Sequence, residues 1–131
     1  MAAALPIPAL TVLVADDDAD MRLYLATCMR GLGLGIGTVI EAANGRDALV
    51  LARAHRFDLV VSDVMMPGLD GLALCRALKA DPATASVPFL LVSGETHAPA
   101  ACADGFLAKP FNAAGLRAHV EHLLARPSLL L

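Results

Sequence analysis

The strongest indication of the fold class is the sequence of residues 10–18, Leu10-Thr-Val-Leu-Val-Ala-Asp-Asp-Asp18. Its first part is an apolar and β-branched run without the alternation of a half-exposed strand, and three aspartates end it abruptly. A short continuous run of this kind is typical of a strand that is buried on both faces. Such strands belong to α/β proteins, in which helices cover a parallel sheet.

The same succession of strand and helix continues along the chain. Asp18 can cap a helix whose apolar residues recur at helical spacing, and the glycines from Gly31 to Gly37 predict a flexible connection after it. We expect further strands at residues 38–42, 57–62, 87–92 and 104–108, and further helices at 45–55, at 71–80 and after Asn112. No hairpin turn signals separate the predicted strands, so crossover helices and parallel pairing follow.

Length and composition set limits on function. The chain has 131 residues, of which 57% are hydrophobic and 18% charged, so it forms one domain with a sizeable core. The formal net charge of −3 has the wrong sign for a protein that tracks a nucleic-acid backbone. Cys28, Cys75 and Cys102 are odd in number and widely spaced, which favours reduced core cysteines over a disulfide framework.

The amino-terminal residues do not form a targeting signal. Residues 1–10 are apolar but lack Lys and Arg, and Pro6 and Pro8 interrupt them. Asp16 and Asp63 cut short the best apolar runs, so no membrane span is expected. We therefore expect a cytoplasmic protein.

Polar side chains stand at the carboxyl ends of four predicted strands. Asp16 and Asp17 follow the first, Asp63 the third, Ser93 the fourth and Lys109 the fifth. Ligands of open α/β sheets bind outside this edge. Clustered carboxylates repel one another unless a cation lies between them, and Mg²⁺ prefers such oxygens together with those of phosphate. A lysine and a hydroxyl also suit phosphoryl oxygens, so the pattern indicates phosphoryl chemistry.

Four motifs in this order resemble the receiver domain of two-component response regulators. They are Val12-Leu-Val-Ala-Asp-Asp-Asp18, Asp58-Leu-Val-Val-Ser-Asp-Val-Met-Met-Pro-Gly-Leu-Asp-Gly71, Leu91-Val-Ser-Gly-Glu-Thr96 and Phe106-Leu-Ala-Lys-Pro-Phe111. The resemblance implies a flavodoxin-like receiver fold, with a five-stranded parallel sheet of order 2-1-3-4-5 and helices on both faces. It implies an extension at residues 1–9, a receiver domain at 10–126 and a short tail at 127–131.

The resemblance also assigns an acceptor and a metal site. Asp63 would be the phospho-acceptor, whose carboxylate attacks a phosphohistidine to form an acyl phosphate. Asp16, Asp17, Asp63 and the backbone carbonyl of Met65 would hold Mg²⁺, with Mn²⁺ as the alternative ion.

Three further residues receive roles from the resemblance. Ser93 and Lys109 would contact the phosphoryl group. Phe106 would be an aromatic switch residue that turns inward as Ser93 moves toward the phosphoryl oxygens.

One segment departs from the family. Only residues 97–103 remain for the helix that the family places between the fourth and fifth strands, so we expect that helix to be shortened or absent. The family's usual signalling face is therefore not expected to be copied.

The resemblance implies a stand-alone receiver that is not an enzyme in its own right. A histidine kinase or a histidine phosphotransfer protein would supply the phosphoryl group, and a downstream protein would read the switch, without direct contact with nucleic acid or a membrane. One alternative is a receiver-like docking module that is not phosphorylated. Another is a phosphohydrolase with Asp16 as nucleophile and Asp18 as acid/base, although Ala19 and Asp20 follow where that family expects Gly-Thr.

Overall fold

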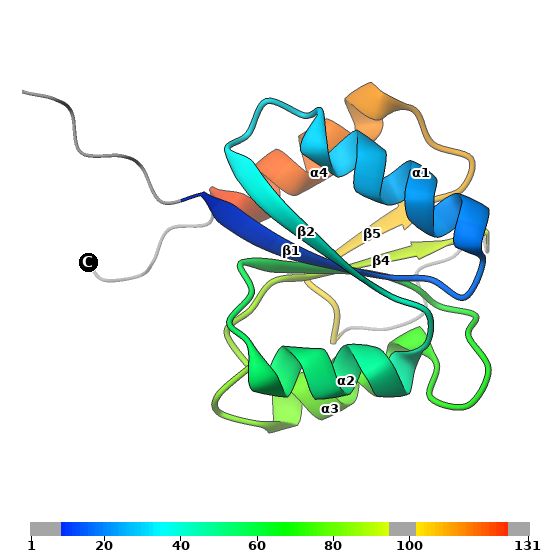
Figure 1. Ribbon diagram of the computed structural model, residues 1–131, viewed down its shortest axis with the longest axis vertical. Coiled ribbons are helices and arrows are strands. Elements are labelled where there is room, and N and C mark those ends of the chain that lie inside the picture. Colours follow the sequence, from blue (N-terminus) through cyan, green and yellow to red (C-terminus); the bar gives the residue numbers. More distant parts are fainter. Residues whose placement is uncertain (1–8, 95–101, 126–131) are drawn as a thin grey trace, which may run out of the picture.

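A parallel sheet forms the centre of the molecule, as the alternating pattern predicted. The computed structural model describes residues 9–94 and 102–125 (Figure 1). The sheet has five strands in the order β2-β1-β3-β4-β5, and every neighbouring pair is parallel. The strands are β1 (Leu10–Ala15), β2 (Ile36–Ala42), β3 (Leu59–Asp63), β4 (Phe89–Ser93) and β5 (Gly105–Ala108).

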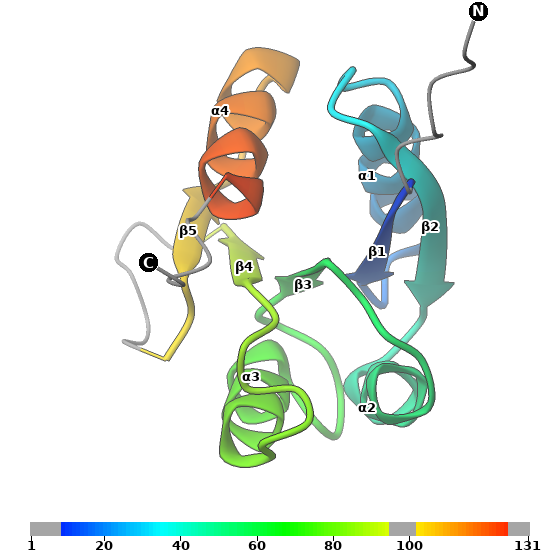
Figure 2. The ribbon, with the colours of Figure 1, turned by 90° about the vertical axis from the view of Figure 1, so that its left-hand side faces the viewer.

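Helices cover both faces of the sheet, which explains the continuous apolar runs of its strands. Figures 1 and 2 show α1 and α4 on one face, and α2 and α3 on the other. The helices are α1 (Ala19–Arg30), α2 (Gly45–Ala54), α3 (Gly71–Ala80) and α4 (Ala113–Leu124). Alternate residues of β1 serve the two layers, since Val12 and Val14 pack toward α1 and α4 while Leu13 packs toward α2 and α3.

Each described helix starts at a side chain that caps it. Asp18, Asn44 and Asn112 accept hydrogen bonds from first-turn amides of α1, α2 and α4, as the sequence predicted. Asp70, which the sequence analysis did not single out, does the same for α3. These caps fix the helix starts within a residue.

Strand boundaries differ from the predicted ones by one or two residues. β2 starts at Ile36, because Ile36 pairs with Leu10. Gly37 therefore belongs to β2 and not to the flexible connection that was predicted; a Cβ atom there would lie 2.3 Å from Cβ of Ala9. β4 starts at Phe89, since Pro88 has no amide hydrogen to donate and the Val87 amide donates to the Thr84 carbonyl at 3.1 Å in the preceding turn.

Three expectations fall wholly or partly outside the described residues. These are the extension at residues 1–9, the tail at 127–131 and most of the short helix at 97–103. Cys102 and Ala103, the described part of that segment, lie in a turn and a bend. None of the described helices has the length and hydropathy needed to cross a membrane.

Candidate functional site

The parallel topology brings the predicted polar residues to one edge of the sheet. Asp16 directly follows β1 and Asp63 ends β3, its neighbour in the sheet. Ser93 ends β4 and pairs with Ala108, so Lys109 follows at the end of β5. The four strands run in the same direction, and their carboxyl ends therefore form one site (Figure 1).

Three carboxylates form the acidic part of this site. Asp16, Asp17 and Asp63 each offer an oxygen, and these atoms all lie within 4.8 Å of one another. Asp16 is fully buried and Asp63 is 7% exposed, whereas Asp17 faces solvent. Carboxylates this close repel one another in a largely dry environment, and a hard divalent cation relieves the repulsion.

One carboxylate oxygen of Asp16 is buried without a hydrogen-bond partner among the described residues, as expected of an atom that binds a metal ion. Oδ1 accepts a hydrogen bond from the Asp18 amide at 2.9 Å. Oδ2 is buried and has no hydrogen-bond partner in the described part of the chain; its nearest cation is Nζ of Lys109 at 3.8 Å. A buried oxygen without a partner is costly, and a metal ion would satisfy it.

The charge environment of Asp16 agrees with this view. Burial raises the pKa of the Asp16 carboxyl above its usual value, and the charge of Asp63 adds to the rise. The hydrogen bond from the Asp18 amide and the charge of Lys109 oppose it. The folded protein therefore carries this negative charge at a cost that a bound cation offsets.

The two oxygens of Asp63 differ. Oδ1 accepts a hydrogen bond from the Val64 amide at 2.9 Å, and Nζ of Lys109 lies 3.4 Å from the same atom. Among the described residues, Oδ2 makes no hydrogen bond. The main chain here is tightly packed, because a Cβ atom at Gly71 would lie 2.1 Å from the Asp63 carbonyl oxygen. One carboxylate oxygen is thus fixed while the other is available to a reactant.

Lys109 connects the acidic cluster to β4. Its amide donates to the Ser93 carbonyl at 2.7 Å, which extends the pairing of β4 and β5 by one step. Its side chain is 23% exposed, and Nζ lies between Asp16 and Asp63. Ser93 itself is 1% exposed. The lysine and the serine therefore lie together at the edge, as the sequence predicted.

Arg22 is a site residue that the sequence analysis missed. Its Nη1 donates to the Asp16 carbonyl oxygen at 2.8 Å, and its Nε lies 3.2 Å from Oε1 of Glu41 on β2. The arginine thus holds the main chain of Asp16 beside β2. A cation in the first turns of a helix that follows three aspartates was the available signal.

The structure places two other predicted residues without testing their roles. Met65 lies just beyond β3 with its side chain 68% exposed. Phe106 lies on β5 opposite Leu91 of β4, and it is half-buried against the core cluster on the α2 and α3 face. Phe106 is therefore a strand residue with access to both the core and solvent.

The capping role of Asp18 bears on the phosphohydrolase alternative. Oδ1 of Asp18 accepts from the amides of Asp20 and Met21 at 3.0 and 3.3 Å. Asp18 does not belong to the acidic cluster formed by Asp16, Asp17 and Asp63. Its carboxylate is engaged with the start of α1, which does not favour a role as acid/base for Asp16.

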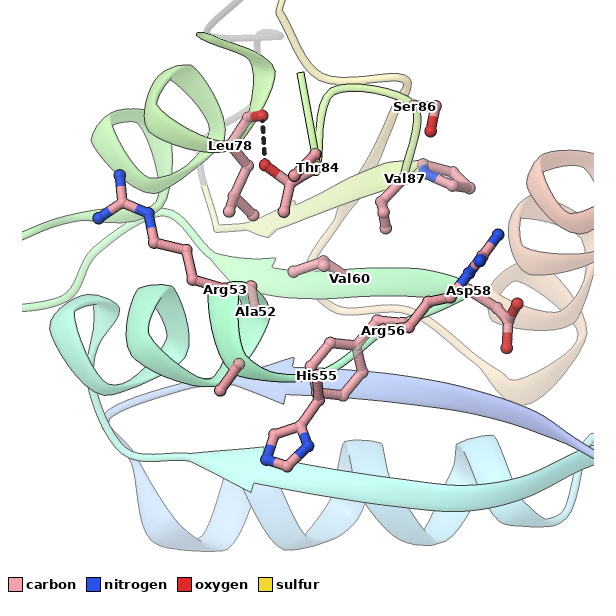
Figure 3. Close-up of a pocket in the computed structure, with 14 residues that line it drawn as sticks. Ala52, Arg53, His55, Arg56, Asp58, Val60, Leu78, Thr84, Ser86 and Val87 are labelled. Carbon is pink, nitrogen blue, oxygen red and sulfur yellow. Dashed lines mark hydrogen bonds between the residues drawn. The ribbon is translucent and has the colours of Figure 1, made fainter. Parts of the chain in front are cut away.

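A pocket lies at the opposite edge of the sheet (Figure 3). It has a volume of about 500 Å³, and Arg53, His55, Arg56 and Asp58 line it beside the starts of β3 and β4. Asp58 and Asp63 are separated by most of β3, which corresponds to about 16 Å of extended chain. This pocket is not part of the acidic site.

Comparison with known proteins gives a consistent result. The profile of the response regulator receiver domain matches residues 12–121. The chemotaxis protein CheY of Pseudomonas aeruginosa is 33% identical over 121 residues, covering 88% of this chain and 96% of the relative. The structure of the chemotaxis response regulator CheY4 of Vibrio cholerae has a TM-score of 0.81 at 31% identity, covering 89% of this chain and 100% of that one.

A further solved structure is similar and contains a ligand. It is the response regulator TrrA of Thermotoga maritima in complex with Mg²⁺ and BeF, with a TM-score of 0.79 and 27% identity. The match covers 88% of this chain and 99% of that one.

Proposed function

Because this chain belongs to the response regulator receiver family, we propose that it accepts a phosphoryl group on Asp63 from a histidine kinase or a histidine phosphotransfer protein. The chain is a receiver signalling domain. Its acidic site for phosphorylation is formed by Asp16, Asp17 and Asp63. We assign the receiver domain to residues 10–126. The family resemblance gives the individual roles, and the geometry of the sheet edge supports those of Asp16, Asp63 and Lys109.

The acidic cluster suits Mg²⁺, and Mn²⁺ is the alternative ion. Asp16, Asp17 and Asp63 would hold it, and we assign a further ligand to the backbone carbonyl of Met65. The orphaned Oδ2 of Asp16 supports this site, because a buried carboxylate oxygen without a donor is a natural ligand. When bound, Mg²⁺ neutralises the carboxylates and stabilises negative charge on phosphoryl oxygens.

The available oxygen of Asp63 is the nucleophile. Oδ2 attacks phosphorus, a P–O bond forms, and the P–N bond of the phosphohistidine breaks with its electron pair left on the imidazole nitrogen. The Val64 amide holds Oδ1 at 2.9 Å, which fixes the orientation of the carboxylate, and Nζ of Lys109 lies 3.4 Å from the same atom. A carboxylate needs no general base to remove a proton before it attacks, so the main contribution of the protein is to position the oxygen next to the phosphorus atom.

The response is a rearrangement around the new phosphoryl group. Lys109 forms a charge-assisted contact with it, and the hydroxyl of Ser93 donates to a second oxygen. The shift at Ser93 is accompanied by an inward turn of Phe106, which lies on the adjoining strand. A downstream protein in the cytoplasm then distinguishes the two forms of the surface.

The observation that carries this proposal is the convergence of three carboxylates and one lysine, with a buried oxygen left unpaired. Intact-mass spectrometry after incubation with acetyl phosphate and Mg²⁺ tests it. We expect one added phosphoryl group in the wild type and none in Asp63→Asn or after chelation of the metal. Asp20→Asn is the matched control, because Asp20 is an exposed carboxylate near the site but outside the cluster.

Two results would contradict the proposal. Labelling that persists in Asp63→Asn would place the acceptor elsewhere. Absence of labelling, together with failure to bind beryllofluoride in the presence of Mg²⁺, would favour the docking module that is not phosphorylated.

A further inference from the structure

Two of the three cysteines lie together on the face of the sheet that α2 and α3 cover. Cys75 lies on α3 and is fully buried in the core cluster of this face. Cys102 precedes β5, is half-buried, and packs against the same cluster. The side chain of Cys102 lies close enough to Cys75 to add to the raised pKa of the Cys75 thiol. Cys28, by contrast, belongs to the cluster on the other face.

An ion pair holds these two segments in position. Nζ of Lys79 lies 2.7 Å from Oδ2 of Asp104. Lys79 follows Cys75 by four residues, so both lie on one face of α3, about 6 Å apart along its axis. Asp104 follows Cys102 by two residues, a separation of at most about 7 Å. The ion pair therefore aligns the chain before β5 with the face of α3 that carries Cys75.

We propose that Cys75 and Cys102 are a reversible dithiol site, at which a hydroperoxide oxidant forms a disulfide that ties the chain entering β5 to α3. The proposal concerns a modification and does not depend on phosphorylation at Asp63. Proximity favours this reaction, since a neighbouring thiol competes with all other fates of an oxidised cysteine.

The two thiols have different parts in the chemistry. Burial raises the pKa of the Cys75 thiol to about 12, and the contact with Cys102 adds to the rise, so Cys75 stays a thiol. Cys102 is the more exposed of the two and meets the oxidant first. Its thiolate attacks the peroxide, the O–O bond breaks, and a sulfenic acid and hydroxide result. The Cys75 sulfur then displaces the sulfenic hydroxyl, and its proton leaves with that group as water.

Tryptic mapping of the whole chain can identify the linked residues. Cys28, Cys75 and Cys102 fall in three separate peptides, residues 23–30, 57–76 and 80–117, because Pro110 protects Lys109 from cleavage. The protein is treated with hydrogen peroxide, denatured, alkylated and digested without reductant. We expect peptide 57–76 linked to peptide 80–117, with a loss of two hydrogens, and release of both peptides by dithiothreitol.

Controls separate a folded-state contact from random pairing. Cys28→Ser is expected to keep the link, and Cys102→Ala to lose it. In urea, where the fold is absent, all three pairings are expected; in the folded protein the 75–102 link should exceed the others by about tenfold. Oxidation of Cys102 to sulfinic acid with Cys75 still alkylated would overturn the proposal. A folded protein with the same mixture of pairings as in urea would also overturn it.

Discussion

The chain has two lysines, and each faces buried or half-buried aspartates. Only one of the two lysines makes a short ion pair with its aspartate. Lys79 lies 2.7 Å from Asp104 and also donates to the carbonyls of Ala85 and Val87. Lys109 lies 3.4 Å from Asp63 and 3.8 Å from Asp16, too far for a strong hydrogen bond to either.

The difference separates a structural ion pair from a functional one. The Lys79 pair fastens α3 to the starts of β4 and β5, and Oδ2 of Asp104 also accepts from the Phe89 amide at 2.8 Å. The Lys109 group has more negative than positive charge and one orphaned oxygen. Such an arrangement costs stability and keeps ligand positions available, which is common at functional sites.

Removal of each lysine in turn should give the largest effect and tests whether the two ion pairs differ. We expect Lys79→Met to lower the free energy of unfolding by about 2–3 kcal/mol, because Asp104 and two carbonyls lose a charged donor. Lys109→Met should lower it by a smaller amount, about 1 kcal/mol, since its contacts at 3.4 and 3.8 Å are longer than the 2.7 Å contact of Lys79. Urea denaturation of the metal-free proteins measures both, and equal losses would show that the two pairs do not differ.

Addition of Mg²⁺ should give the next largest effect, at the acidic cluster alone. At ten times its dissociation constant, Mg²⁺ should stabilise the wild type by about 1.4 kcal/mol, because it binds the folded acidic cluster and not the unfolded chain. Asp16→Asn should lose this gain, whereas Glu121→Gln, on α4, should keep it. Thermal unfolding at constant ionic strength tests this, and an equal gain with Na⁺ would indicate nonspecific screening.

Neutralising one aspartate should change the free energy of unfolding in opposite directions beside Lys109 and beside Lys79. We expect Asp16→Asn to stabilise the metal-free protein by about 1 kcal/mol at neutral pH, and Asp104→Asn to destabilise it. The raised pKa of Asp16 means that the folded state holds its proton to higher pH than the unfolded state. The contribution of Asp16 to the stability of the wild type therefore falls as the pH rises above 3.8, which is the ordinary pKa of this carboxyl group.

The advantage of Asp16→Asn should accordingly be absent in acid and grow with pH. Urea denaturation of wild type and variant over a pH series measures it. A gain that is the same at every pH would show that the carboxyl group is not the cause.

The smallest effect is expected at the rim of the site. Glu41→Gln removes the negative charge that faces Arg22 Nε but leaves the hydrogen bond from Arg22 to the Asp16 carbonyl. Exposed ion pairs contribute little, so the free energy of unfolding should change by less than about 0.5 kcal/mol. A change above 1 kcal/mol by urea denaturation would assign Glu41 a structural role.

Hydrophobic periodicity was sufficient to predict the strands, the helices and the edge that carries the site, whereas the strand order 2-1-3-4-5 came from the family resemblance. The parallel arrangement follows from the strand and helix order, and it brings Asp16, Asp63 and Lys109 together although they are distant in sequence. The caps Asp18, Asn44 and Asn112 were equally visible, because they act within their own helix turn. Local rules and topology thus account for most of the framework.

Features that depend on long-range side-chain contacts could not be predicted. Lys79 on α3 donates to the carbonyl of Val87 before β4, and no local pattern reveals this contact. The bond from Arg22 to the Asp16 main chain and the contact of Cys75 with Cys102 also join different elements. The orphaned Oδ2 of Asp16 is a property of packing, which residue order alone does not contain.

The most direct test of the acidic site is to locate the phosphoryl group. Phosphorylated protein is reduced with borohydride, which converts an aspartyl phosphate to homoserine, and is then digested with trypsin. Peptide 57–76 contains Asp58, Asp63 and Asp70, so its fragment ions distinguish the acceptor from two internal controls. We expect homoserine at position 63 alone, and only when Mg²⁺ is present. Homoserine at position 58 or 70, or in the peptide that carries Asp16 and Asp17, would contradict the assignment of Asp63 as acceptor.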